Sequence, residues 1–144
     1  MAIRNILDTL GDGSHTAVPK YFSQVTITWT GAAGVSGIQS TITYVKVDKL
    51  CLINISGFTM PNVSYNLEFI SDSTIPTEID IPAAQKGPSF VHISNGVNTG
   101  GVAYIGTDSK IHISGDMFIP TGFYVGATNA GLPNGGKIMY TSSI

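Results

Sequence analysis

Charged side chains are scarce in this chain of 144 residues. Asp, Glu, Lys and Arg together make up 11% of it, against roughly a quarter of an ordinary soluble domain. Hydrophobic residues reach 42%, and the mean hydropathy is +0.23. Much of the surface must then be apolar or neutral. Because exposed apolar surface promotes aggregation, we expect identical copies of the chain to cover part of it in an obligate oligomer.

Basic residues and cysteine are also few. The net charge is −2, and the seven Lys and Arg residues form no basic stripe, so phosphate-driven binding of nucleic acid is not expected. Cys51 is the single cysteine, which excludes an internal disulfide and a Cys-rich zinc site. Its place within LCLINI predicts a small buried side chain.

Long apolar runs are missing as well. The opening MAIRNILDTLGDG lacks the apolar run of about seven or more residues that a secretory signal needs. No stretch approaches the ~18 apolar residues of a membrane helix. We therefore expect no membrane insertion, and folding in a reducing cytoplasm. Gly11, Gly13 and Pro19 interrupt any long helix, so residues 1–24 are predicted to be a leader or connector, with the remnant of a longer shaft as the alternative.

Short β-rich runs separated by turn residues follow from residue 25 onward. No segment keeps a helical period over about ten residues, and this pattern is typical of an all-β sandwich or barrel. The sequence predicts one domain over 25–144 with eight or nine strands. The predicted strands are 25–30, 40–47, 49–56, 66–70, 89–94, 101–106, 110–114, 122–127 and 137–142. Residues 40–56 form either a tight hairpin at Asp48 or one long bent strand, and 71–88 is predicted to be a proline-rich loop.

Two near copies, VHISNG at 91–96 and IHISGD at 111–116, each place a histidine between β-branched residues. Strand alternation turns the apolar residues towards the core and His92 and His112 away from it. We expect strand 101–106 between them, which separates the two histidine strands by about 9–10 Å and argues against a shared metal ion. Two alternatives stay open: a metal held by both, or equivalent histidines of three subunits that bind an ion on a symmetry axis. No cofactor is expected.

No constellation typical of catalysis is evident. Ordinary strand serines flank the histidines, without a sharp Gly-x-Ser-x-Gly turn. Glu78 and Asp80 could suit glycoside hydrolysis or calcium, but a solvated loop edge explains them better. GVNTGG and GLPNGGK are only superficially like phosphate loops, since no helix follows either. The sequence therefore favours a protein that is not an enzyme.

The order of the motifs over residues 40–144 is that of a known family. The motifs are YVKVDKLCLINI, IPAAQKGP, VHISNG, VAYIGTDSKIHIS and a closing KIMYTSS. This succession resembles the small β-sandwich head domains at the C-terminal ends of phage and viral fibre and tail proteins. Asp48 and Ser109 stand where that family has turn glycines, and Lys86 takes the basic place in a proline element that is one residue longer.

The resemblance implies a homotrimeric, jelly-roll-like antiparallel β-sandwich displayed on a virion beside other virion proteins. Such a knob is made in the host cytoplasm, has no enzyme activity, and binds a host glycan or protein receptor or serves only trimerisation. Tyr65, Phe123 and Tyr124 are the aromatic residues that we expect at a contact surface. The competing interpretation is a free-standing carbohydrate-binding module or lectin. For that module Trp29 is a further sugar-stacking candidate, although its parity with Ile27 places it at the edge of the core.

Overall fold

The computed structural model describes residues 20–30, 37–60, 68–79, 86–94, 98–115 and 129–142. Strands dominate this part of the chain, together with one short 3₁₀ turn, η1 (Thr77–Ile79). The strands are β1 (Lys20–Thr30), β2 (Gln39–Val47), β3 (Leu50–Ile55), β4 (Phe58–Met60), β5 (Phe69–Thr74), β6 (Lys86–Ser94), β7 (Asn98–Ile105), β8 (Lys110–Ser114), β9 (Ala130–Leu132) and β10 (Gly136–Thr141). The predicted all-β class is confirmed. Among the described elements, none is a helix with the length and apolar character needed to cross a membrane.

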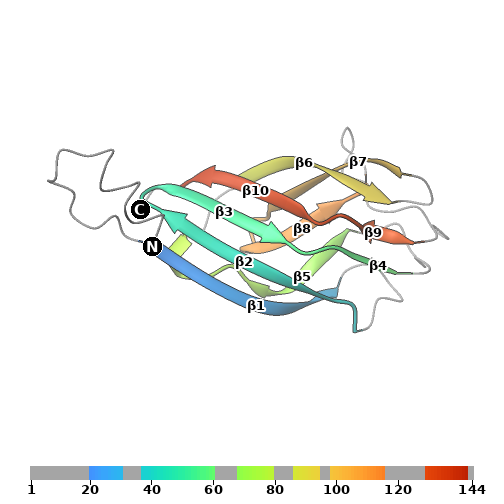
Figure 1. Ribbon diagram of the computed structural model, residues 1–144, viewed down its shortest axis with the longest axis horizontal. Coiled ribbons are helices and arrows are strands. Elements are labelled where there is room, and N and C mark those ends of the chain that lie inside the picture. Colours follow the sequence, from blue (N-terminus) through green and yellow to red (C-terminus); the bar gives the residue numbers. More distant parts are fainter. Residues whose placement is uncertain are drawn as a thin grey trace, which may run out of the picture.

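The strands form one antiparallel sheet in the order β10-β3-β2-β1-β5-β8-β7-β6-β9-β4, and the sheet curls into a half-barrel. Figure 1 shows the result as two facing layers. Layer A consists of β10, β3, β2 and β1, and layer B of β5, β8, β7, β6, β9 and β4. β1 joins the layers, because Lys20–Thr28 pair with β2 whereas Trp29 and Thr30 pair with β5. At the other side, β10 pairs with β3 in layer A, and β9 pairs with β4 in layer B. The chain therefore passes from layer A to layer B between β3 and β4, and returns to layer A between β9 and β10.

Several boundaries differ from those predicted. β1 begins at Lys20 and not at residue 25, because its first residues continue the ladder with β2. β5 runs to Thr74, into the segment that was predicted to be a loop. β4 and β9 were not predicted, since strands of three residues are too short to show a period and hold each other by pairing. Residues 1–19 and the predicted strand 122–127 lie outside the described residues.

Tight turns connect the central strands. Val47 pairs with Leu50, so 40–56 is a hairpin and not one bent strand. Asp48 in this turn has a φ of 54°, and Ser109 in the β7–β8 turn has a φ of 61°. Both lie in the left-handed region, which favours glycine. Pro88 lies within β6 at an irregularity of the ladder between Lys86 and Ser89, a place in a sheet where proline is tolerated.

The core fills the space between the layers and centres on three aromatic rings. Trp29 is 0% exposed and stacks on Phe58 at a centroid distance of 4.7 Å, and Phe58 meets the edge of Phe69 at 5.2 Å. The indole Nε1 of Trp29 donates a hydrogen bond of 3.0 Å to the hydroxyl of Ser40. Trp29 is therefore a core residue, and its alternative role as an exposed sugar platform is wrong. Cys51 is buried as predicted.

Candidate functional site

The two histidines lie on separate parts of layer B. β7 lies between β6 and β8, and Val91, Ile93, Ile111 and Ile113 are buried, so the predicted arrangement and orientation are confirmed. His92 pairs with Gly100 of β7, whereas His112 pairs with Tyr104. The two partners lie four residues apart on β7, so the histidines are about 13 Å apart along the strand direction, in addition to their separation across the sheet. One ion cannot join His92 and His112 within a chain. Within the described ranges, no group of three or more His, Cys, Asp or Glu side chains could hold a metal ion.

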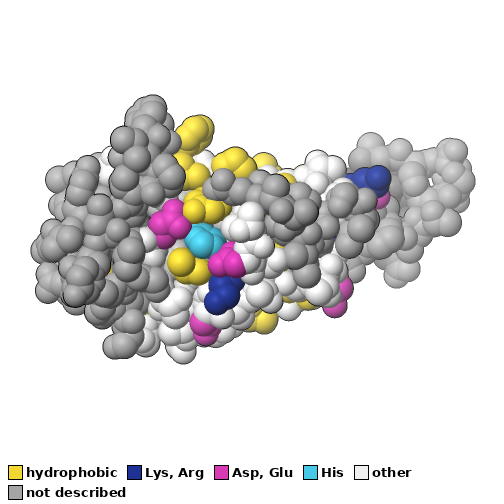
Figure 2. Space-filling model, turned by 180° about the vertical axis from the view of Figure 1, so that it is seen from behind, with side chains coloured by type: hydrophobic (Ala, Val, Ile, Leu, Met, Phe, Trp, Pro, Cys, Tyr) yellow, Lys and Arg dark blue, Asp and Glu magenta, His cyan; other side chains and the backbone are white. Residues whose placement is uncertain are grey.

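His112 instead lies between two carboxylates. Its Nδ1 is 2.9 Å from Oε2 of Glu68, and its Nε2 is 3.0 Å from Oδ1 of Asp108. The hydroxyl of Tyr104 donates to both oxygens of Glu68 at 2.8 and 2.9 Å, and its ring stacks on the imidazole at 5.0 Å. In Figure 2 a histidine lies between acidic side chains on the outer face of layer B. We call these four residues the His112 cluster.

The backbone at Gly106 allows the side chains of His112 and Asp108 to lie close to it. A Cβ on Gly106 would come within 2.5 Å of Nε2 of His112 and 2.6 Å of Oδ1 of Asp108, so a larger residue there would displace these two side chains from their present positions. Neither carboxylate was predicted as a partner of His112, and Glu68 precedes a different strand. Asp108 could have been predicted from the local sequence, since it lies four residues before His112 across a short turn. The cluster joins the start of β5 to the β7–β8 hairpin.

The cluster shifts the pKa of each of its members. Burial alone would lower the pKa of His112, but its hydrogen bonds to Glu68 and Asp108 and their negative charges raise it above the ordinary value. Burial would raise the pKa of Glu68, yet the hydrogen bonds from His112 and Tyr104 hold it below its usual range. Burial would also raise the pKa of Asp108, but its hydrogen bonds with His112 and with the backbone N–H of Lys110 lower it. The protonated imidazole, which donates from both nitrogens, is thus the favoured form.

These shifts predict a pH dependence of stability. Because the pKa of folded His112 is raised, its contribution is complete below the unfolded value of ~6.5 and is lost as the pH rises through the folded value. The carboxylates contribute above their unfolded pKa values and lose this as the pH falls through the lowered ones. We expect His112→Gln to cost about 1–2 kcal/mol near pH 6 and less at pH 9. Urea unfolding at a series of pH values measures this.

His92→Gln is the matched control for that experiment. His92 is exposed on the same face of layer B and has no carboxylate among its described partners. We expect the pH dependence that the His112 cluster confers, and that His112→Gln removes, to remain in this variant. Equal slopes in the His112→Gln variant and the wild type would show that the cluster does not stabilise the fold in the way described.

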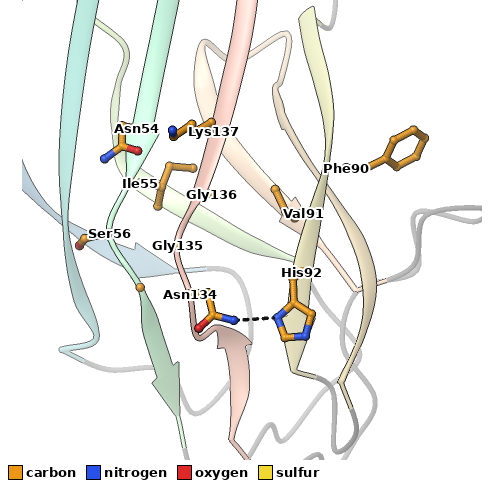
Figure 3. Close-up of a pocket in the computed structure, with 11 residues that line it drawn as sticks. Asn54, Ile55, Ser56, Phe90, Val91, His92, Asn134, Gly135, Gly136 and Lys137 are labelled. Carbon is orange, nitrogen blue, oxygen red and sulfur yellow. Dashed lines mark hydrogen bonds between the residues drawn. The ribbon is translucent and has the colours of Figure 1, made fainter.

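A groove follows the seam where β10 of layer A faces β6 of layer B. Its volume is about 470 Å³. Figure 3 shows Asn54 and Lys137 at one end and the pair Asn134 and His92 at the other. The amide Nδ2 of Asn134 is 3.2 Å from Nδ1 of His92. The described residues that line it are Asn54, Ile55, Ser56, Gly57, Phe90, Val91, His92, Asn134, Gly135, Gly136 and Lys137. We call this the seam groove.

The outer face of layer A carries an uncovered apolar surface. The registers place Phe22 beside Val45, Val45 beside Leu52, and Leu52 beside Met139, so one row crosses all four strands. Val47 and Leu50 pair with each other next to this row. Phe22 is 69% exposed, Met139 60% and Leu50 54%. We call the six residues the apolar face: Phe22, Val45, Val47, Leu50, Leu52 and Met139. A polar row of Gln24, Thr43, Asn54 and Lys137 runs beside it.

A scan against models of protein families finds no match, and no curated protein matches the chain. The interpretation therefore depends on the geometry of the chain itself.

The predicted aromatic contacts cannot be placed by this geometry. Tyr65, Phe123 and Tyr124 lie outside the described residues, as does Asp80. Glu78 is exposed in η1. The structure has two surfaces that were not predicted from the sequence, the seam groove and the apolar face. A signal for the apolar face was present in LCLI at 50–53, because a strand with consecutive apolar residues is typical of one that is covered on both sides.

Proposed function

We propose that this protein is a structural head domain of a viral or phage fibre or tail, assembled as a homotrimer and displayed for contact with a host surface. The apolar face is the observation that carries the proposal. Its side chains are contiguous across four strands, and water contacts them directly in a single chain. Exposed apolar patches of this kind mark surfaces that another protein covers.

The size of the apolar face fits the centre of an interface between subunits. Its six side chains expose on the order of several hundred Å², whereas one partner of a standard interface buries about 800 Å². The polar row with Gln24 and Lys137 then lies at the rim, as in known interfaces with an apolar centre. Few charged residues have to be desolvated, because the chain is 11% charged.

An exposed hydrophobic side chain on layer B favours a ring of subunits and not a two-fold dimer. Phe90 is 78% exposed and extends from β6 of layer B, beside Val102. Figure 3 shows its ring turned away from the seam groove. In a ring, each subunit presents two different surfaces to its two neighbours, whereas a two-fold dimer uses one surface twice. The apolar face and the surface around Phe90 supply two such surfaces on different layers.

The backbone at the two turns supports the resemblance to fibre heads. Asp48 and Ser109 occupy the positions where that family has glycine, and both adopt positive φ. A residue with a side chain adopts this conformation at a cost of about 1–2 kcal/mol, whereas glycine adopts it freely. A backbone that suits glycine at both positions supports the proposal.

The mass of the protein in solution tests the proposal. We expect light scattering at micromolar concentration to give about three times the chain mass of 15.1 kDa. A mass of 15.1 kDa would overturn the fibre-head interpretation and leave the carbohydrate-binding module as the better one.

A further inference from the structure

We propose that the seam groove binds a carboxylated sugar, such as a uronic acid unit of a surface glycan. This inference names the ligand class for the contact role proposed above and takes its biological meaning from that role. The binding itself depends only on residues of one chain, which come mainly from β3, β6, β10 and the turn before β10.

The groove has the shape and polarity of a site for a small polar ligand. Its volume of about 470 Å³ lies within the range of roughly 300–1,000 Å³ that is usual for small-molecule sites. Ile55 and Val91 are buried beneath it and supply an apolar base. Gly135 and Gly136 expose their backbone because they have no side chains. A pyranose ring likewise combines apolar and polar parts, with C–H groups on its faces and hydroxyls around its edge.

The side chains at the rim provide donors and acceptors for hydroxyl groups. The Nδ2 group of Asn134 donates towards Nδ1 of His92, which leaves its carbonyl oxygen as an acceptor. In the tautomer whose Nδ1 accepts this hydrogen bond, the Nε2 of His92 carries a proton and can donate it to a hydroxyl. Asn54 adds a second amide at the far end of the groove (Figure 3). Amides suit sugars because one group can both donate to and accept from neighbouring hydroxyls.

The charge of the groove selects an acidic ligand. Among the described residues that line the groove, Lys137 is the one Lys or Arg and none is Asp or Glu, although the chain as a whole has a net charge of −2. Asn54 pairs with Lys137 across the β3–β10 ladder, so an amide and an ammonium group lie together. A single ammonium matches a single carboxylate through a charge-assisted hydrogen bond. An acidic peptide with several carboxylates would find one cation and several amides.

Glucuronate and glucose make the sharpest pair of probes, because they differ only in the carboxylate. We expect an NMR titration with glucuronate to shift the signals of Lys137, His92 and Asn134, and glucose to shift them at least about ten-fold more weakly at equal concentration. Equal shifts with both sugars, or no shifts with either, would overturn the proposal. So would competition by a poly-glutamate peptide as strong as that by a glucuronate-containing oligosaccharide.

Lys137→Ala tests the role of the cation. We expect this variant to bind glucuronate at least about ten-fold more weakly, and Lys137→Arg to keep most of the affinity. Lys49→Ala is the matched control, because it removes the same charge from the exposed β2–β3 turn. Equal losses in Lys137→Ala and Lys49→Ala would show a general charge effect and contradict a site in the groove.

The mass of the protein separates this proposal from the preceding one. A trimer that fails to bind glucuronate would leave the structural head standing and remove the sugar site. A single chain that binds glucuronate through Lys137 would keep the site and remove the head.

Discussion

Trp29→Ala is expected to lower the free energy of unfolding by about 3–5 kcal/mol. Trp29 is the largest fully buried side chain, lies at the point where β1 passes from layer A to layer B, and stacks on Phe58. Alanine removes the ring contacts with Phe58 and leaves a cavity between the layers, so the transfer and the cavity costs add. Chemical denaturation at a fixed protein concentration measures the loss, since association also contributes to the apparent stability.

Ser40→Ala is the control that separates the ring from its hydrogen bond. It leaves Nε1 of Trp29 without its described partner inside the core and is expected to cost about 1–3 kcal/mol, less than loss of the ring. If Trp29→Ala cost less than about 1 kcal/mol, the two layers would not be held together by the aromatic centre.

The double variant Phe22→Lys with Met139→Lys is expected to convert the proposed trimer into folded single chains. Both side chains lie at the ends of the row that crosses layer A, and both are solvent-exposed in one chain, so neither change removes core packing. Within a trimer each lysine would be buried without a partner, which costs several kcal/mol. We expect the dissociation constant to rise by a factor of about 10³ or more. Light scattering gives the mass, and circular dichroism shows whether the strands remain.

The matched control places the same charges on the polar row. Gln24→Lys with Thr43→Lys adds two lysines to the outer face of layer A, on β1 and β2. Charges at the rim of an interface have small effects, so this variant should stay trimeric. A trimer that tolerates the first pair of lysines as well as the second would assemble through another surface.

The strand pattern could be predicted from the sequence because most strands have one buried and one outer face. The alternation in β2 and in 110–114 is read directly from β-branched residues and matches their burial. Two short strands and one strand boundary could not be predicted in this way. β4 and β9 have three residues each and depend on their mutual pairing. The start of β1 depends on its ladder with β2, since Lys20–Gln24 have no clear alternation of their own.

The candidate surfaces were harder to predict because they combine distant segments. The direction of the histidine side chains could be predicted from the local alternation, but the partner Glu68 lies just before β5, 44 positions away from His112. The seam groove joins residue 54 to residue 134 and exists only because β10 and β6 face each other when the sheet curls. The apolar face needs the order of four strands, which local patterns do not contain.

The structure of the assembled protein in solution, determined by cryo-electron microscopy or crystallography, tests the central claim most directly. We predict three copies around an axis, with Phe22, Leu50 and Met139 of each copy covered by a neighbour. Particles in which these three side chains face solvent in every copy, or in which the chain occurs alone, would contradict the account.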